Sequence, residues 1–394
     1  MLSRCLLAAV VLLTSTMSNA HESRLDETIE TAMASTGAEG LAVAVVRGGE
    51  VTHISAHGVR NAQRDPLTQH SVMYGASLTK TVFAYFVLQL VDDGMLELDQ
   101  TIGTLLPRPL PEYEGFGSTH APWPDLARDP RWKAITPRML LTHSSGFRNF
   151  HFVTPDGRLD FENGTLDIHF DPGTRYLYSG DGFILLQFVL EQGLGLDVRK
   201  EMENRVFAPL GMTSTDMMWR DEFSENLADG FTAAGDPVPH DDRSKVRAAG
   251  SMDTTIADMA RFAQALATCR GLSERACVEL FRPSIEIAMP TQFYALDAAP
   301  PEGSAYPGLA AGLGLITTQG PQGRVVFKGG HNDSTGNMMV CLPDAGDCVV
   351  LLANDVRAEA GFPMLVEAAL GETGVPWRWE YPNLEIIDHR RSGD

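Results

Sequence analysis

The chain has 394 residues, a formal net charge of −20 and an ordinary share of apolar residues, so it can bury one large core or two smaller ones. Its few lysines and arginines are scattered along the sequence. A nucleic-acid-binding surface needs clustered basic residues and is therefore not expected, and the acidity by itself indicates mainly solubility.

The first twenty residues have the pattern of a Sec-type signal peptide. Arg4 precedes the apolar run LLAAVVLL, and Ser18-Asn19-Ala20 offers small residues for cleavage. The alternative is an uncleaved anchor, but the apolar run is too short to span a membrane stably. No later segment is long and apolar enough to span. We therefore expect a mature protein that is periplasmic or secreted after cleavage near Ala20.

Cleavage would remove Cys5 and leave four cysteines in two close pairs, Cys269 with Cys277 and Cys341 with Cys348. The second pair flanks LPDAGD, a turn sequence between two apolar strands, so a cross-strand bridge is sterically reasonable. An oxidising compartment would permit it. Four cysteines still allow three connectivities, and the sequence leaves that choice open.

The predicted elements follow a clear order along the chain. A short amphipathic helix around residues 25–33 precedes two strands within 41–58, joined at Gly48-Gly49, and then a helix over 77–93 that is apolar on nearly all faces. Helical pieces separated by proline-rich connectors follow, and strands return after residue 310. The pattern predicts an α/β domain formed by residues 21–104 and 276–394, with an inserted helical lobe at 105–275.

Ser77 and Lys80 stand three residues apart at the start of the predicted buried helix. The simplest interpretation is a helix-capping serine and a lysine that extends to solvent. However, an unbroken apolar run follows Lys80, and burial would lower the pKa of its ammonium group. A desolvated lysine one turn from a serine is a known way to activate a nucleophile. The sequence therefore predicts that Ser77 is a nucleophile and that Lys80 is its base.

Other catalytic motifs are missing from the sequence. There is no G-x-S-x-G, H-E-x-x-H, C-x-x-C or Walker-type glycine loop. Two segments resemble metal clusters, His240-Asp241-Asp242 and the H-x-D of residues 331–333, and both fit polar loops better. No metal ion or organic cofactor is expected.

Further segments, in a fixed order, resemble the serine β-lactamase and penicillin-binding protein superfamily. The resemblance is to its class C β-lactamase-related branch, which includes D-peptidases and family VIII esterases. It implies an α/β fold of the β-lactamase/transpeptidase type, with an antiparallel sheet flanked by helices from both chain ends and an all-helical lobe. The segments that carry it are YGASLTK, ITPRMLLTHSSGF, PGTRYLYSGDGFILLQFVLE, PLGMTSTDM and AAGSMDTTIADMARFAQAL.

The resemblance places Tyr178 at the tyrosine of the family's Y-x-N motif, where it would pass a proton to the leaving group. The alternative is a structural core tyrosine. The third motif, FKGGHNDSTG, admits two registers. In one, Lys328-Gly329-Gly330 replaces K-T-G, and the backbone N–H of His331 joins that of Ser77 as an oxyanion hole. In the other, His331 takes the H-x-G role, but Asp333 then stands where the family has glycine. We prefer the first register, in which the alternative for Lys328 is a solvated strand-end lysine.

Two departures from the family pattern concern substrate binding. Gly180 replaces the asparagine of Y-x-N, and Gly329 replaces a threonine or serine, so an amide and a hydroxyl are lost. These losses put the specificity of a true β-lactamase in doubt. We expect an exported serine hydrolase that acts on small esters, D-peptides or β-lactam-like rings. The rival hypotheses are a catalytically silent cell-wall-binding relative and a metal-dependent hydrolase that uses His331, Asp333 and the cluster His240-Asp241-Asp242.

Overall fold

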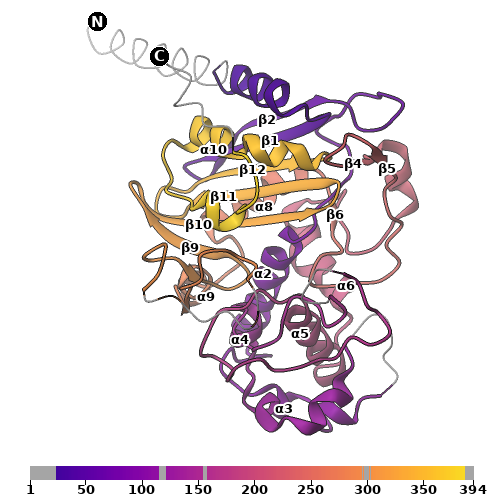
Figure 1. The fold of residues 1–394 in the computed structure, drawn as a ribbon, viewed down its shortest axis with the longest axis vertical. Helices are drawn as coiled ribbons and strands as arrows, with labels where there is room; N and C mark the ends of the chain where they lie inside the picture. Colours follow the sequence, from indigo (N-terminus) through magenta and orange to yellow (C-terminus); the bar gives the residue numbers. More distant parts are fainter. Residues whose placement is uncertain are drawn as a thin grey trace, which may run out of the picture.

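The computed structural model describes residues 24–114, 121–153, 158–294, 296, 301 and 303–386. The predicted signal peptide lies outside this part of the chain. In Figure 1 a sheet and its covering helices form the upper part of the molecule, and α3 (Ile102–Leu105), α4 (Pro137–Leu141) and α5 (Gly180–Gly193) lie in the lower part. The helix α2 (Leu78–Asp92) runs between the two.

The sheet has eight strands in the order β2-β1-β12-β11-β10-β9-β8-β7, and all neighbours are antiparallel. Two strands come from the start of the chain and six from residues 285–353. This confirms the predicted fold class, a sheet built from both chain ends. The strands are β1 (Gly40–Arg47), β2 (Glu50–Gly58), β7 (Ile285–Glu286), β8 (Ala310–Ala311), β9 (Ile316–Gly320), β10 (Gly323–Asn332), β11 (Thr335–Leu342) and β12 (Asp347–Ala353).

The hairpin predicted at Gly48-Gly49 joins β1 to β2, and both glycines have positive φ, as a tight hairpin turn requires. Strand β1 is buried on both faces because helices cover both sides of the sheet. Its alternate residues enter two separate apolar cores: Ala42, Ala44 and Val46 face one, and Leu41, Val43 and Val45 face the other.

The first core lies between the sheet and α8 (Ile256–Thr268), which packs on β1 and β12. The second lies under α10 (Phe362–Leu370) and the helix of residues 24–36. The predicted helical lobe at 105–275 included α8. In the structure, α8 instead covers one face of the sheet, because its apolar face is buried against β1 and β12. The limits of the two predicted domains stay a prediction.

The lobe is made of short elements around α5, which is buried like α2. The remaining elements of the described chain are α6 (Val198–Met202), α7 (Ala208–Leu210), α9 (Glu274–Phe281), α11 (Trp377–Glu380), the strand pairs β3 (Met73–Tyr74) with β6 (Asp253–Thr254) and β4 (Gly230–Phe231) with β5 (Pro237–Val238), the 3-10 turns η1 (Leu110–Glu112), η3 (Trp123–Arg128), η4 (Pro130–Ala134), η6 (Asp221–Asn226) and η7 (Val356–Gly361), and the π-helical turn η5 (Glu203–Phe207).

Both cysteine pairs are disulfides, Cys269–Cys277 and Cys341–Cys348. The second joins directly opposed residues of β11 and β12, as the turn sequence between them predicted. Of the three possible connectivities, the structure has the one in which each cysteine is bonded to the cysteine closest to it in the sequence.

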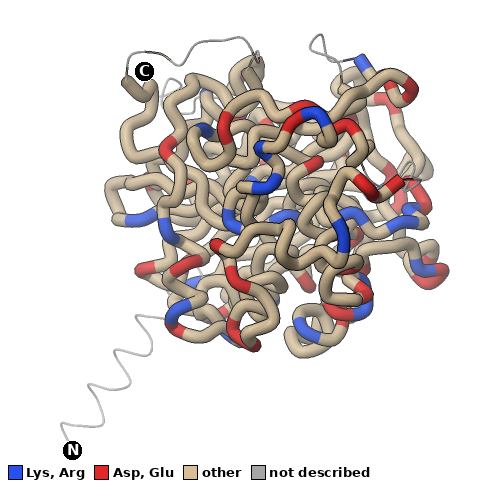
Figure 2. Tube along the Cα trace, turned by 90° about the horizontal axis from the view of Figure 1, so that it is seen from below, with Lys and Arg blue, Asp and Glu red and all other residues tan. Residues whose placement is uncertain are grey.

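Acidic and basic residues are interspersed along the chain (Figure 2). Among the described residues, no helix combines the length and the apolar character that crossing a membrane requires.

Candidate active site

Ser77 lies at the turn between β3 and α2. The preceding residue, Ala76, has a left-handed backbone (φ 45°), which is unusual for a residue with a side chain and common beside functional sites. Ser77 is the N-cap of α2, but its hydroxyl makes no capping hydrogen bond. The hydroxyl instead meets the side chains of Lys80 and Tyr178. The interpretation of Ser77 as a capping serine is therefore wrong.

Lys80 is 1% exposed, so the alternative of a lysine that extends to solvent is also wrong. Its Nζ donates to Ser77 Oγ (3.0 Å) and to the backbone carbonyl of Ala249 (2.5 Å). No carboxylate of the described residues forms an ion pair with it. Burial lowers the pKa of Lys80; a negative charge on Tyr178 opposes this shift, and the nearby Lys328 adds to it.

Tyr178 precedes Ser179, the N-cap of α5, and its phenol donates to Ser77 Oγ (2.8 Å) across 101 residues of sequence. The side chain is buried between two lysines, with both Nζ atoms 5.0 Å from the ring centroid. Burial raises the pKa of the phenol, but the charges of Lys328 and Lys80 and the hydrogen bond with Ser77 outweigh it. The net effect lowers the pKa from 10 to about 7.

The imidazole ring of His143 packs against the ring of Tyr178. His143 was not among the predicted site residues. Its ring stacks on the Tyr178 ring at 4.5 Å between centroids, and its Nδ1 accepts a hydrogen bond from the backbone N–H of Ser179 (3.0 Å). Burial and the two lysines hold the pKa of His143 well below its usual value, so the ring is neutral. His143 belongs to the segment TPRMLLTHSSGF, which resembles the family, so the sequence could have indicated this histidine as a site residue.

Lys328 lies on β10 and is 3% exposed, which excludes the solvated strand-end lysine. The strand alternates, so the side chain of His331 points elsewhere: its Nδ1 is 3.1 Å from Glu359 Oε1, and the hydrogen bond with this carboxylate raises the pKa of His331. The structure thus places Lys328, and not the imidazole of His331, against Tyr178. This geometry agrees with the first of the two registers.

Gly330 brings β10 directly against the start of α2. A Cβ atom on Gly330 would lie 2.8 Å from Ser77 N and 2.9 Å from Leu78 N, so only glycine allows this approach. Among the described residues, nothing accepts a hydrogen bond from the backbone N–H of Ser77. A substrate oxygen between this N–H and that of His331 stays the predicted oxyanion arrangement.

Glu380 enters the site from the C-terminal tail, a segment to which the sequence analysis gave no function. Its carboxylate is buried, its Oε2 accepts from Gln292 Nε2 (3.1 Å), and its Oε1 would lie 2.0 Å from a Cβ on Gly329. Burial raises the pKa of Glu380, and the charge of Lys328 opposes this. The space that a threonine side chain would take at position 329 is therefore filled by a carboxylate.

Gly180 lies under the ring of Phe150, and a Cβ there would lie 2.3 Å from Phe150 Cε1 and 2.8 Å from the carbonyl of Asn149. Position 180, where the family motif has a substrate-binding asparagine, therefore does not line the cleft here, because this ring separates it from the cleft. Asn149 and Phe150 line the cleft in its place, and the Asn149 amide oxygen accepts from the Gly180 N–H (3.1 Å).

The catalytic side chains described above line a cleft of about 260 Å³ between the sheet and the lobe, a volume close to that of small-molecule sites. Tyr178 and Lys328 are remote in sequence from Ser77 and Lys80, and all four converge here, while Phe150, Phe152 and Phe293 form apolar walls.

The predicted metal-like segments do not form one group. His331 bonds to Glu359, Asp333 is exposed, and His240 contacts Asp253 beside the cleft. Within the part of the chain that the structure describes, no three His, Cys, Asp or Glu side chains are arranged to hold a metal ion.

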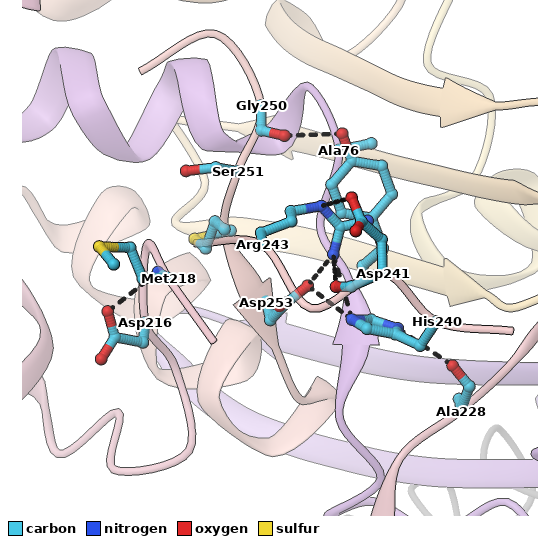
Figure 3. A network of polar contacts seen from close by, with 12 residues as sticks. Ala76, Asp216, Met218, Ala228, His240, Asp241, Arg243, Gly250, Ser251 and Asp253 are labelled. Carbon is cyan, nitrogen blue, oxygen red and sulfur yellow. Dashed lines mark hydrogen bonds and ion pairs between the residues drawn. The ribbon is translucent and has the colours of Figure 1, made fainter. Parts of the chain in front are cut away.

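A second buried charged cluster lies next to the cleft (Figure 3). Asp253 is completely buried; its Oδ1 accepts from Arg243 Nη1 (2.8 Å) and lies 3.1 Å from His240 Nε2. The Arg243 guanidinium stacks on the Tyr74 ring, with 3.6 Å between its Cζ and the ring centroid. This cluster anchors Tyr74, three residues before Ser77.

Comparison with known proteins gives three kinds of match. A family model described as beta-lactamase matches residues 25–370. The chain is 31% identical over 188 residues to a lovastatin esterase of Penicillium rubens (43% of this chain, 46% of that one), and 29% identical over 222 residues to a monacolin J acid methylbutanoyltransferase of Aspergillus terreus (48% and 52%). The chain thus spans about half the length of these curated relatives.

The solved structure of a beta-lactamase/D-alanine carboxypeptidase from Pseudomonas syringae superposes with a TM-score of 0.69 at 18% identity. The match covers 89% of this chain and 98% of that one, and at this identity it shows the fold. Because the family model spans nearly all of the described residues, the chain belongs to the beta-lactamase family of serine hydrolases.

Proposed function

We propose that this protein is an exported serine hydrolase that cleaves small esters through an acyl-enzyme on Ser77. One observation carries the proposal: Lys80 Nζ and the Tyr178 hydroxyl both contact Ser77 Oγ, at 3.0 and 2.8 Å, and both groups are buried and have lowered pKa values. A serine hydroxyl in contact with two such groups can lose its proton near neutral pH.

In the proposed reaction, Ser77 Oγ attacks the ester carbonyl and Lys80 takes its proton. The carbonyl oxygen becomes negative and accepts from the backbone N–H groups of Ser77 and His331. Tyr178 then supplies a proton to the departing alcohol oxygen, and water hydrolyses the acyl-enzyme by the same proton path. Lys80 and Tyr178 each shift the pKa of the other, so a proton can pass between them during the reaction.

Two features of the cleft favour esters over β-lactams. Beside Lys328, the carboxylate of Glu380 fills the space of a side chain at position 329, so this position offers no hydroxyl to a substrate carboxylate, and the negative charge of Glu380 would repel it. At Gly180, the ring of Phe150 replaces the amide that would orient an acylamino group. Since orientation supplies much of the rate, we propose slow turnover of β-lactams and D-peptides. The curated relatives named as an esterase and an acyltransferase agree with an ester substrate.

Export is part of the proposal. It is supported by the signal-like first twenty residues and by two disulfides, which persist in oxidising compartments.

Labelling with a fluorophosphonate, followed by mass spectrometry of the modified peptide, tests the proposal. We expect a single adduct on Ser77, which a nitrophenyl ester substrate competes away. Ser77→Ala should fold normally, lose the label and lower ester hydrolysis by about a thousandfold or more. An unlabelled wild type that binds cell-wall fragments would instead identify a catalytically silent relative, and activity lost to chelators would identify a metal enzyme.

A further inference from the structure

A second cavity of about 440 Å³ adjoins the catalytic cleft. Tyr74, Arg247 and Gly250 line both spaces, so a substrate bound at Ser77 can extend from one into the other. The second cavity lies between the loop of residues 238–251 and the turn that joins β10 to β11.

Arg247 lies at the junction, and its backbone is fixed. Its N–H donates to Ser251 Oγ (2.9 Å), and the side chain of Gln187 bonds to both neighbouring residues, at the Val246 carbonyl and the Ala248 N–H. The side chain of Arg247 therefore reaches the junction from a segment of backbone that is held in place by hydrogen bonds.

The Arg247 side chain is half-buried, yet it forms no ion pair or side-chain hydrogen bond with any described residue, and its Nε is fully buried without an acceptor. Asp181 is close enough to interact electrostatically, but its carboxylate oxygens bond to His151. A desolvated guanidinium donor without an acceptor is unfavourable. A carboxylate would remove this cost, because its two oxygens match the fork of the guanidinium.

The other charged groups of this cavity are not equivalent to Arg247. Arg243 is paired with Asp253 and stacked on Tyr74, so its charge is already balanced (Figure 3). Asp241 and Asp242 are exposed and Asp229 is half-buried, and these three would repel an anion near them; Lys245 is basic but exposed to solvent, where its charge is screened. An anionic group is therefore favoured at the junction.

Strand β10 gives the direction of the substrate. Lys328 lies beside Tyr178 in the cleft, Gly330 lies against Ser77 N, and Asn332 lines the second cavity. The leaving group must be near Tyr178, which protonates it, and hence near Lys328. The acyl group then extends the other way along β10, past Gly330 towards Asn332 and the second cavity, and Arg247 lies where the two cavities join.

We infer that the second cavity is an acyl subsite in which Arg247 binds a carboxylate, and that the preferred substrates are monoesters of dicarboxylic acids. This inference rests on the proposed ester hydrolysis at Ser77. The ester C–O bond breaks, the alcohol leaves with one proton, and the acyl group bonds to Ser77 Oγ. Water then releases the dicarboxylic acid and restores the serine hydroxyl.

The test compares two activated esters whose acyl chains have the same length, 4-nitrophenyl hydrogen adipate and 4-nitrophenyl hexanoate. We expect the wild type to give a kcat/KM about tenfold higher for the adipate ester, the scale of one charge-assisted hydrogen bond. Arg247→Gln should bring this ratio close to one, and Arg247→Lys should keep part of it. Arg275→Gln removes an exposed arginine far from the cleft and should leave the ratio unchanged. A ratio measured within one preparation is independent of the folded fraction.

The outcomes separate the inference from the proposed function. Hydrolysis of both esters that depends on Ser77, with a ratio that Arg247→Gln does not change, would overturn the acyl subsite and leave the esterase intact. Absence of hydrolysis and of Ser77 labelling would overturn both. A third substrate, the hexanoyl ester of 3-hydroxybenzoate, carries its carboxylate on the leaving group. If Arg247→Gln weakened its hydrolysis as strongly, relative to phenyl hexanoate, Arg247 would be a general attractor of anions and the acyl-side assignment would be wrong.

Discussion

Two buried charged clusters lie within a few residues of Ser77, and they differ in how their charge is balanced. In the cluster around Asp253, a carboxylate meets a guanidinium at 2.8 Å and an imidazole at 3.1 Å. In the cluster around Lys80, an ammonium meets only the serine and phenol hydroxyls and a backbone carbonyl, and a second ammonium, Lys328, lies on the far side of the Tyr178 ring.

The difference explains why one cluster is structural and the other is chemical. Opposite charges in contact satisfy each other, so the Asp253 cluster gains rigidity at Tyr74. Burial and then the like charge of Lys328 lower the pKa of Lys80, and the charges of the two lysines lower the pKa of Tyr178 against the opposing effect of burial. Burial of an ionisable group does not by itself identify a catalytic residue. A buried ionisable group that has no opposite charge beside it is a more reliable sign of one.

The largest expected effect is on stability and comes from the balanced cluster. Asp253→Asn leaves Arg243 buried without its partner and should lower the free energy of unfolding by about 3 kcal/mol. Urea denaturation measures this. The double variant with Arg243→Met should recover part of the loss, because the two residues interact directly. Folded Asp253→Asn should still react with the fluorophosphonate; unchanged stability would show that the pair is not structural.

Breaking the unbalanced cluster should affect activity instead. Lys80→Met removes the base and should lower kcat/KM for a nitrophenyl ester roughly a hundredfold, with little change in the urea midpoint. Lys200→Met removes an exposed lysine and serves as the matched control. A wild-type rate in Lys80→Met would make Lys80 a structural residue.

The third prediction uses the pKa of Tyr178, which is lowered to about 7. Below this pH the pair of Lys80 and Tyr178 carries both protons and cannot accept one from Ser77. The kcat/KM should therefore rise about tenfold per pH unit up to about pH 7 and then level off. In Tyr178→Phe the step near pH 7 should disappear together with most of the activity. A profile that falls as the pH rises through 7 would mean that the protonated phenol is the active form.

The sequence predicted the reacting groups but not what surrounds them. Ser77, Lys80, Tyr178 and Lys328 each belong to a short segment whose residue types and order along the chain were sufficient. The buried helix that follows Ser77 could be predicted because its apolar residues cover all faces. The fold class followed from strands at both chain ends and helical segments between them.

The specificity residues were not predictable in this way. Glu380 is 44 residues beyond the end of FKGGHNDSTG, and only the path of the C-terminal tail brings it against Gly329. Phe150 and Arg247 likewise acquire their positions from tertiary packing, and no local periodicity marks them. Gly180 and Gly329 were recognised as departures from the family pattern, but the side chains that fill the vacated space became visible only in the structure.

The smallest expected effect concerns Glu380, which partly balances Lys328 inside the otherwise unbalanced cleft. Burial raises the pKa of Glu380, and Lys328 opposes this, so the two charges influence each other without forming an ion pair within 4.0 Å. Glu380→Gln removes the negative charge and should make Lys328 more attractive to an anionic leaving group. We expect kcat/KM for the hexanoyl ester of 3-hydroxybenzoate to rise about threefold relative to phenyl hexanoate, as a partly screened charge at this range allows.

Glu372→Gln, which neutralises an exposed carboxylate in the same tail, is the control. The gain should shrink at high salt, and penicillin turnover should remain slow because position 329 still lacks a hydroxyl. A fall in the ratio would mean that Glu380 helps to hold Lys328 in place, and that the balance of charge in the cleft depends on the tail as much as on the two lysines.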